Sequence, residues 1–194
     1  MSLNLLSIQS LKQIYKMKNT FINYIQLKSA RCVLNLGVRD IGELIGTSRT
    51  TISKIENNLL SPSQLRLAER RNNILETFFK KNSIFFPNYY TISTHNNSDN
   101  TQTVSQQKNV LTRFQLRVAR TIINNTILEF STSIGEKRGI IEYAESLTNN
   151  TYISPKNNQI INKIKLAFKQ HGIEFPDNFT VTFKKIVDTP QNIC

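Results

Sequence analysis

The stretch VRDIGELIGTSRTTISKIE, residues 38–56, decides the fold because it can form two short helices joined by a tight turn. Residues 38–45 form the first helix, and Gly46 ends it, since glycine enters the left-handed backbone conformation at the least cost. Ser48 can cap a second helix that runs to the end of the stretch and turns its two isoleucines inward. The stretch therefore predicts a helix, a turn and a second helix.

The whole pattern recurs with a constant offset of 89 residues. The segment QLKSAR at 26–31 matches QLRVAR at 115–120, and the same offset carries Gly46 onto Gly135. Further pairs at this offset are Ile52 with Ile141, Glu56 with Glu145, Phe79 with Phe168, Ile84 with Ile173 and Pro87 with Pro176. Because self-similarity at one fixed offset is the signature of a repeated structural unit, we expect two copies of one fold.

Each copy predicts the same series of elements. An amphipathic helix precedes the helix pair, a fourth helix follows it, and a short β segment ends the copy. The fourth helix of the first copy begins after Pro62 and runs to about Lys81, and the β segments span 84–92 and 173–183. In the second copy Thr126 stands three residues before a glutamate, which is the capping-box spacing of a helix start. The predicted fold class is therefore mainly α with a small β component.

The β ribbons and one polar segment define the expected organisation. Residues 93–111 are nearly all small or polar and lack an apolar period, which is typical of a flexible linker. A two-stranded ribbon is marginally stable alone, so we expect the ribbons of the two copies to pair with each other or with a second subunit. The expected segments are an N-terminal amphipathic extension (1–22), a first unit with its ribbon (23–92), the linker (93–111), a degenerate second unit with its ribbon (112–185) and a tail (186–194).

The composition indicates a globular protein with an anionic partner. Hydrophobic residues make up 39% of the chain, which is enough for a buried core. The formal net charge is +12, which favours nucleic acid or an acidic membrane surface as the partner. Residues 1–93 hold 13 Lys or Arg against 5 Asp or Glu, and residues 94–194 hold 12 against 8. The first copy is therefore the expected DNA reader.

Several kinds of protein are disfavoured by the sequence. It contains no apolar run long enough to span a bilayer and no recognisable secretory signal, so we expect a cytoplasmic protein. The segment 1–39 has no acidic residue and suits an organellar transit peptide as well as an amphipathic helix. Cys32 and Cys194 form no disulfide framework, and His95 and His171 lack neighbours at metal-ligand spacing. Since catalytic motifs are also missing, we expect no enzyme activity, cofactor, metal or small-molecule ligand.

With these residues in place, the segment 26–81 resembles the DNA-binding domain of the XRE family, the Cro- and lambda-repressor-like regulators. The residues that carry the resemblance are Ala30-Arg31 in the first helix, Ile41-Gly42 in the second, Gly46-Thr47-Ser48 in the turn, and Ile52, Ile55 and Glu56 in the third helix. Two departures are Val38, where the family commonly has a glutamine that contacts phosphate, and Gly42, where alanine would favour the helix. The resemblance implies two tandem lambda-repressor-like helical domains, each followed by a short β-strand or hairpin.

The resemblance also implies the site residues. In that family the third helix lies in the major groove and presents its N-terminal residues to base edges. The implied DNA contacts are Thr47, Ser48, Arg49, Thr50, Thr51, Ser53, Lys54 and Asn57, the last at the DNA backbone. A buried ion pair joins the first helix to the end of the third in the family, which here implies Arg31 with Glu56 and Arg120 with Glu145.

The second copy keeps the scaffold of the first but not its reading face, the outer side of the third helix that would contact bases. Its third helix carries Glu136, Gly139 and Glu142 on the outer side, and carboxylates repel phosphates. We therefore expect the first copy alone to read bases.

The implied function is a sequence-specific transcriptional regulator, such as a repressor, that binds double-stranded DNA as a homodimer. The second copies or the β ribbons would form the dimer contact, and pairing of the two ribbons within one chain is the competing arrangement. Two other functions stay open. One is the antitoxin of a toxin-antitoxin pair, which binds both DNA and toxin, and the other is a protein-interaction module on the same helical scaffold.

Overall fold

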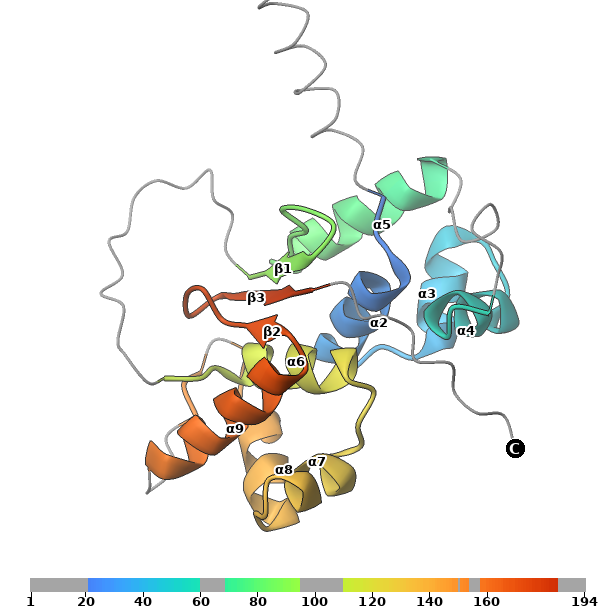
Figure 1. Ribbon diagram of the computed structural model, residues 1–194. Coiled ribbons are helices and arrows are strands. Elements are labelled where there is room, and N and C mark those ends of the chain that lie inside the picture. Colours follow the sequence, from blue (N-terminus) through green and yellow to red (C-terminus); the bar gives the residue numbers. More distant parts are fainter. Residues whose placement is uncertain (1–20, 60–68, 95–109, 150, 154–157, 185–194) are drawn as a thin grey trace, which may run out of the picture.

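The computed structural model describes residues 21–59, 69–94, 110–149, 151–153 and 158–184. Within these ranges the protein is mainly helical, with a small antiparallel sheet (Figure 1). The first copy contains α2 (Tyr24–Val33), α3 (Val38–Ile45), α4 (Arg49–Glu56), α5 (Glu69–Lys81) and β1 (Thr91–Ser93). The second copy contains α6 (Arg113–Ile122), α7 (Ile127–Ser133), α8 (Arg138–Ser146), α9 (Asn158–Gln170), β2 (Ile173–Glu174) and β3 (Thr180–Phe183). The predicted tail, most of the predicted extension and linker, and the start of the fourth helix lie outside the described residues.

The helix ends follow the local signals in the sequence. Helix α3 ends at Gly46, whose φ of +63° lies in the left-handed region, and Gly135 repeats this conformation after α7 with a φ of +67°. Ser48 caps α4, because its Oγ accepts a hydrogen bond from the amide three residues on, at 3.1 Å. At the start of α7, Thr126 Oγ1 accepts from the Glu129 amide at 3.2 Å, and the Glu129 carboxylate accepts from the Thr126 amide at 2.6 Å. The predicted capping box is therefore confirmed.

The repeat holds in three dimensions down to single hydrogen bonds. Gln26 on α2 donates from Nε2 to the carbonyls of Asn88 and Thr91, at 2.7 and 3.0 Å. Its counterpart Gln115 on α6 donates to the two carbonyls at the matching positions, at 2.6 and 3.2 Å. In each copy one buried glutamine thus ties the first helix to the turn that precedes the last strand.

The sheet joins the two copies. Its strand order is β1-β3-β2, and β1 pairs antiparallel with β3 in the register Thr91 to Thr182, Ile92 to Val181 and Ser93 to Thr180. The two ribbons therefore pair with each other within the chain, which is the first of the two arrangements predicted for them. The hairpin of the first copy is reduced to a single bridge between Phe85 and Ser93.

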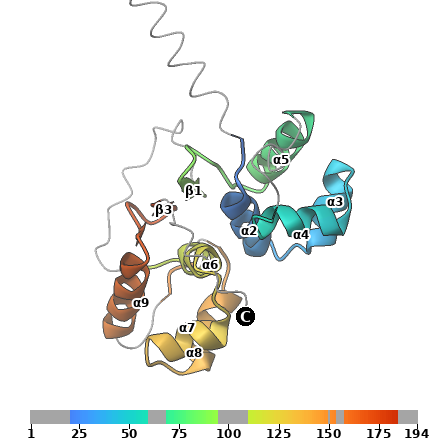
Figure 2. The ribbon, with the colours of Figure 1, turned by 45° about the vertical axis from the view of Figure 1, so that its right-hand side comes forward.

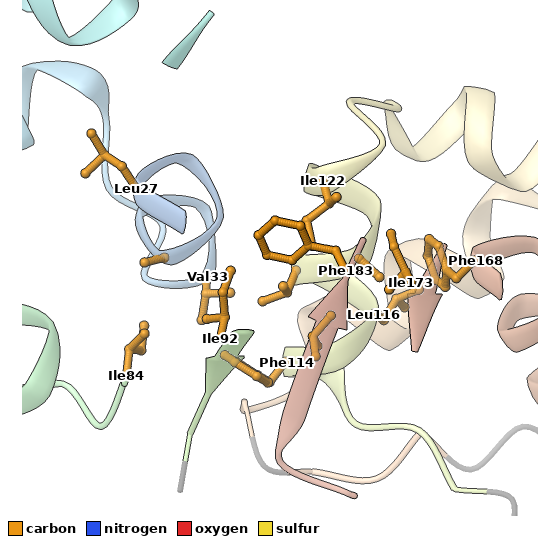
Figure 3. Close-up of a cluster of buried hydrophobic side chains, with 14 of the residues drawn as sticks. Leu27, Val33, Ile84, Ile92, Phe114, Leu116, Ile122, Phe168, Ile173 and Phe183 are labelled. Carbon is orange, nitrogen blue, oxygen red and sulfur yellow. The ribbon is translucent and has the colours of Figure 1, made fainter. Parts of the chain in front are cut away.

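The two copies share one hydrophobic core. Helix α2 packs against α6, and both helices are buried on more than one side, since even Gln26, Ser29 and Thr121 are buried. Figure 3 shows the cluster, with side chains from the first copy facing side chains from the second. Its labelled members are Leu27, Val33, Ile84 and Ile92 from the first copy and Phe114, Leu116, Ile122, Phe168, Ile173 and Phe183 from the second. The sequence predicted two units joined by a linker, and the structure adds an extensive contact between them.

Candidate nucleic-acid interface

The turn and the start of α4 form the surface that the sequence predicted to meet DNA. Among the eight predicted contact residues, the exposed ones are Ser48, Arg49, Thr50, Lys54 and Asn57, and the half-buried ones are Thr47, Thr51 and Ser53. All eight lie on α4 or within two residues of its ends. The structure thus brings the predicted residues together on one short helix.

These side chains divide into two groups by their partners. Ser48 and Thr51 bond to each other through their hydroxyls at 2.9 Å and complete the helix cap, so they fix the start of α4. Arg49, Thr50 and Lys54 make no side-chain hydrogen bond or ion pair within the part of the chain that the structure describes. Two cations and one hydroxyl are therefore open to an external partner.

The inner face of α4 is held by the predicted ion pair. Arg31 Nε and Nη2 donate to the two carboxylate oxygens of Glu56, both at 2.7 Å, and Nη1 donates to the Leu36 carbonyl at 2.7 Å. The Glu56 side chain is 4% exposed, and its hydrogen bonds raise the pKa of the Arg31 guanidinium above its usual value. A two-pronged pair of this kind fixes orientation as well as distance. It therefore anchors the end of α4 to α2.

The second copy contains the other predicted pair with the same geometry. Arg120 donates to both carboxylate oxygens of Glu145, at 2.5 and 2.8 Å, and to the Asn125 carbonyl at 2.6 Å. Two further guanidinium groups approach the same region, because Arg117 Nε lies 3.9 Å from Glu145 and Arg113 Nε donates to the Glu145 carbonyl at 3.1 Å. Burial lowers the pKa of both Arg113 and Arg117. Glu145 is thus surrounded by three arginines, two near its carboxylate and one on its main-chain carbonyl, and the first copy lacks this basic cluster.

Gly42 has a role that the sequence interpretation missed. A Cβ atom at this position would lie 2.8 Å from the Thr47 carbonyl oxygen, closer than such contacts occur. Because glycine and not alanine stands here, α3 can approach the turn that precedes α4. In the second copy the equivalent position holds Ser131, whose Oγ donates to the Leu128 carbonyl at 2.9 Å. No local signal distinguishes a glycine of this kind from one that merely weakens a helix.

Arg71 is a second residue that the sequence interpretation missed. It lies on α5, and its guanidinium donates to the carbonyls of Ile45 at 3.2 Å and Gly46 at 3.1 Å. These carbonyls end α3, where a helix leaves acceptors unpaired and where cations are favoured. Arg71 thus supports the turn from behind, but as one arginine among several in a basic helix it carries no distinctive sequence signal.

The outer face of α8 differs from that of α4 in chemistry. Two carboxylates are present there, that of Glu142 on α8 and that of Glu136 just before the helix. Both are paired, Glu142 with Arg138 at 2.7 Å and Glu136 with Lys163 at 2.6 Å. The expected repulsion of phosphate is therefore weaker than the sequence alone suggested. Tyr143, which occupies the position of Lys54, is 65% exposed. The second copy offers an exposed aromatic ring where the first offers a cation.

Comparison with protein-family models, with curated proteins and with solved structures found no match to this chain. The described residues include no helix that is both long and apolar enough for a bilayer. They also contain no group of three His, Cys, Asp or Glu side chains placed to hold a metal ion.

Proposed function

We propose that the protein is a sequence-specific DNA-binding regulator of transcription that inserts α4 into the major groove. The observation that carries the proposal is the arrangement of α4, whose back is fixed by a buried ion pair while Arg49, Thr50 and Lys54 remain open on its front. A net charge of +12 and the resemblance of residues 26–81 to XRE-family regulators support it.

The open side chains suit distinct contacts. Arg49 lies in the first turn of α4, and its guanidinium can donate two hydrogen bonds to O6 and N7 of a guanine. Thr50 can place its methyl group against a thymine methyl or its hydroxyl against a base. Lys54 and Asn57, one to two turns later, suit phosphate oxygens, which position the helix without reading sequence.

The test begins with selection of binding sites by the full chain from random double-stranded DNA. We expect one enriched motif, and fluorescence anisotropy on it should show affinity that falls steeply with salt because counterions are released. Arg49→Ala should lose the sequence preference. Lys169→Ala, which removes one exposed cation from α9, is the matched control and should retain it. Selection that enriches no motif would overturn the proposal.

A protein-interaction module is the second candidate, and the surface of the second copy favours it. Leu128, Tyr143 and Leu166, on α7, α8 and α9, are 56%, 65% and 59% exposed, so large apolar side chains on three helices are accessible to a protein partner. An antitoxin would combine both functions, with the first copy on DNA and the second on a toxin. If the affinity for every DNA probe tested were insensitive to salt, the protein-binding function alone would be favoured.

A further inference from the structure

The β1–β3 ladder relates the two copies by an approximate two-fold axis, or pseudo-axis, within a single chain. At the repeat offset, Thr91 corresponds to Thr180, Ile92 to Val181 and Ser93 to Thr182. In the β1–β3 ladder Thr91 pairs with Thr182, Ile92 with Val181 and Ser93 with Thr180. Exchanging the copies therefore reproduces the same ladder, with its centre at the Ile92–Val181 pair.

The flanking pair obeys the same symmetry. The Phe85–Ser93 bridge in the first copy corresponds at the offset to the Glu174–Thr182 pair in the second. Helices α2 and α6, which are also equivalent, pack against each other. An interface that uses the same patch from both sides is the kind formed by two-fold symmetric homodimers. The chain thus builds from its two halves what a homodimer builds from two chains.

We infer that one chain is a complete DNA-binding unit whose site has two unequal halves, one read by α4 through bases and the other held by α8 through phosphates. This inference rests on the proposed function. In homodimeric helix-turn-helix proteins the two recognition helices meet half-sites one helical turn apart, because the protein axis coincides with the axis of the operator. The pseudo-axis of this chain relates α4 to α8 in the same manner.

The position of the helices agrees with this geometry. Figure 2 shows α3–α4 beside α2 and α7–α8 beside α6, with the sheet on another side of this central helix pair. Contacts across the pair fix the two halves: Lys28 Nζ donates to Asn124 Oδ1 at 2.7 Å, and Arg113 Nη1 donates to the Val33 carbonyl at 3.1 Å. The spacing of the two helices is therefore set by a packed interface.

The side chains of α8 determine the type of contact. Lys137 and Arg138 stand at the positions of Ser48 and Arg49, and both are exposed. The remaining positions of the reading face, equivalent to Thr50, Thr51, Ser53 and Lys54, hold Gly139, Ile140, Glu142 and Tyr143. Two cations at the start of a helix suit phosphates, and Arg138 is further restrained by its pair with Glu142. The second half of the site should therefore contribute affinity and little sequence preference.

The ribbons of the chain are already occupied by each other. The sequence predicted a homodimer held by ribbons or second copies, and the β1–β3 ladder uses within one chain the strand pairing that a ribbon-linked dimer would need. A homodimer on a palindromic site is therefore the competing outcome.

The test compares two duplexes that share the selected motif, one extended by a further helical turn on the side of α8 and one cut back to the motif. Native mass spectrometry of the full chain on the longer duplex should show one chain per duplex. Hydroxyl-radical footprinting should show two protected patches about one helical turn apart. Changing the sequence of the second patch should leave affinity unchanged, whereas removing it should weaken binding about tenfold because phosphate contacts are lost.

The matched variant removes both α8 cations. Lys137→Ala with Arg138→Ala should weaken binding to the longer duplex about tenfold and leave the short duplex unaffected, while Arg49→Ala should weaken both. Thermal melting of the variant checks that the fold is retained. Two chains per duplex with a palindromic footprint, or equal affinity for the two duplexes, would overturn the inference. Absence of any selected motif would instead overturn the proposed function.

Discussion

The two copies share their buried contacts and differ on their surfaces. Both have the arginine–glutamate pair between first and third helix, and both have the glutamine that ties the first helix to the ribbon turn. The outer face of α4 is open and hydroxyl-rich. That of α8 carries a glycine, a tyrosine and the Glu142 carboxylate, which pairs with Arg138 on the same helix. The buried polar contacts are therefore common to both copies, while the solvent-facing positions determine what each copy can bind.

The ion pairs provide the strongest test of the shared scaffold. Glu56→Gln should lower the free energy of unfolding by about 3–5 kcal/mol, because Arg31 then keeps a buried charge without its partner. Glu145→Gln should cost more, since Arg117 and Arg120 would both lose its carboxylate, and Arg113 would keep only its hydrogen bond to the main-chain carbonyl of residue 145. Chemical denaturation of both variants measures the difference.

The exposed pair of α8 supplies the control. Glu142→Gln breaks the Arg138–Glu142 pair, whose side chains are 61% and 44% exposed, and should cost less than about 1 kcal/mol. If Glu145→Gln proved no more costly than Glu56→Gln, the basic cluster would not depend on that carboxylate, and the two junctions would be energetically alike.

The two copies are also expected to differ in whether they read bases. Arg49→Ala should weaken binding to the selected motif by about 1–3 kcal/mol and relax the preference at one base pair. Arg138→Ala, at the equivalent position, should weaken all sequences alike and by less, because this side chain is partly engaged with Glu142. Anisotropy titrations on the longer duplex that carries the motif, and on single-base variants of that duplex, measure both effects. Equal, sequence-dependent losses from the two variants would mean that both copies read bases.

Alanine substitutions at two glycines should change the stability of the protein in opposite directions. Gly42→Ala should destabilise the protein by about 1–3 kcal/mol, since the added methyl group would meet the Thr47 carbonyl and force α3 from the turn. Gly139→Ala should stabilise it by up to about 1 kcal/mol, because α8 has open space there and alanine favours the helix. Thermal melting of the two variants is the measurement. Stabilisation by Gly42→Ala would show that the close approach can relax at no cost.

The smallest expected effect concerns Lys54. Lys54→Ala should weaken binding to every DNA sequence equally and reduce the slope of log affinity against log salt by about 1, as the loss of a single phosphate contact requires. Tyr143→Ala, at the equivalent position of the second copy, should leave that slope unchanged because tyrosine carries no charge. A salt series on one duplex with both variants decides whether the two positions differ as predicted.

The elements of the first copy could be predicted because their signals are local. Gly46, Ser48 and the inward isoleucines fix the bounds of α3 and α4 within neighbouring residues, and the structure begins and ends those helices where the sequence predicted. The ion pairs followed from the resemblance and from their equal spacing of 25 residues. Local patterns therefore gave most of the fold and the candidate reading face.

The contact between the copies could not be predicted in the same way. Helix α6 buries Arg113, Gln115 and Thr121, polar residues that a pattern of apolar and polar positions assigns to the surface. Arg113 reaches the other copy, where it donates to the Val33 carbonyl, and Gln115 donates to the ribbon turn of its own copy at Asp177 and Thr180. Burial of this kind depends on partners 62 to 80 residues away in the sequence. For the same reason the ribbons left two pairings open, and only the register of β1 with β3 decided between them.

The β1–β3 ladder has a consequence for how chains associate. Because the ladder joins two separate units of one chain, the first copy of one chain can pair with the second copy of another through the same contacts, which is the condition for domain swapping. Closed and swapped forms then differ little in contact energy, and their balance depends on the effective concentration that the chain between Thr94 and Val110 imposes. Covalent connection of two binding partners typically gives an effective concentration of about millimolar, so the closed form should dominate in dilute solution. Shortening the connection until it no longer spans the two ends would convert the same sequence into an obligate swapped assembly.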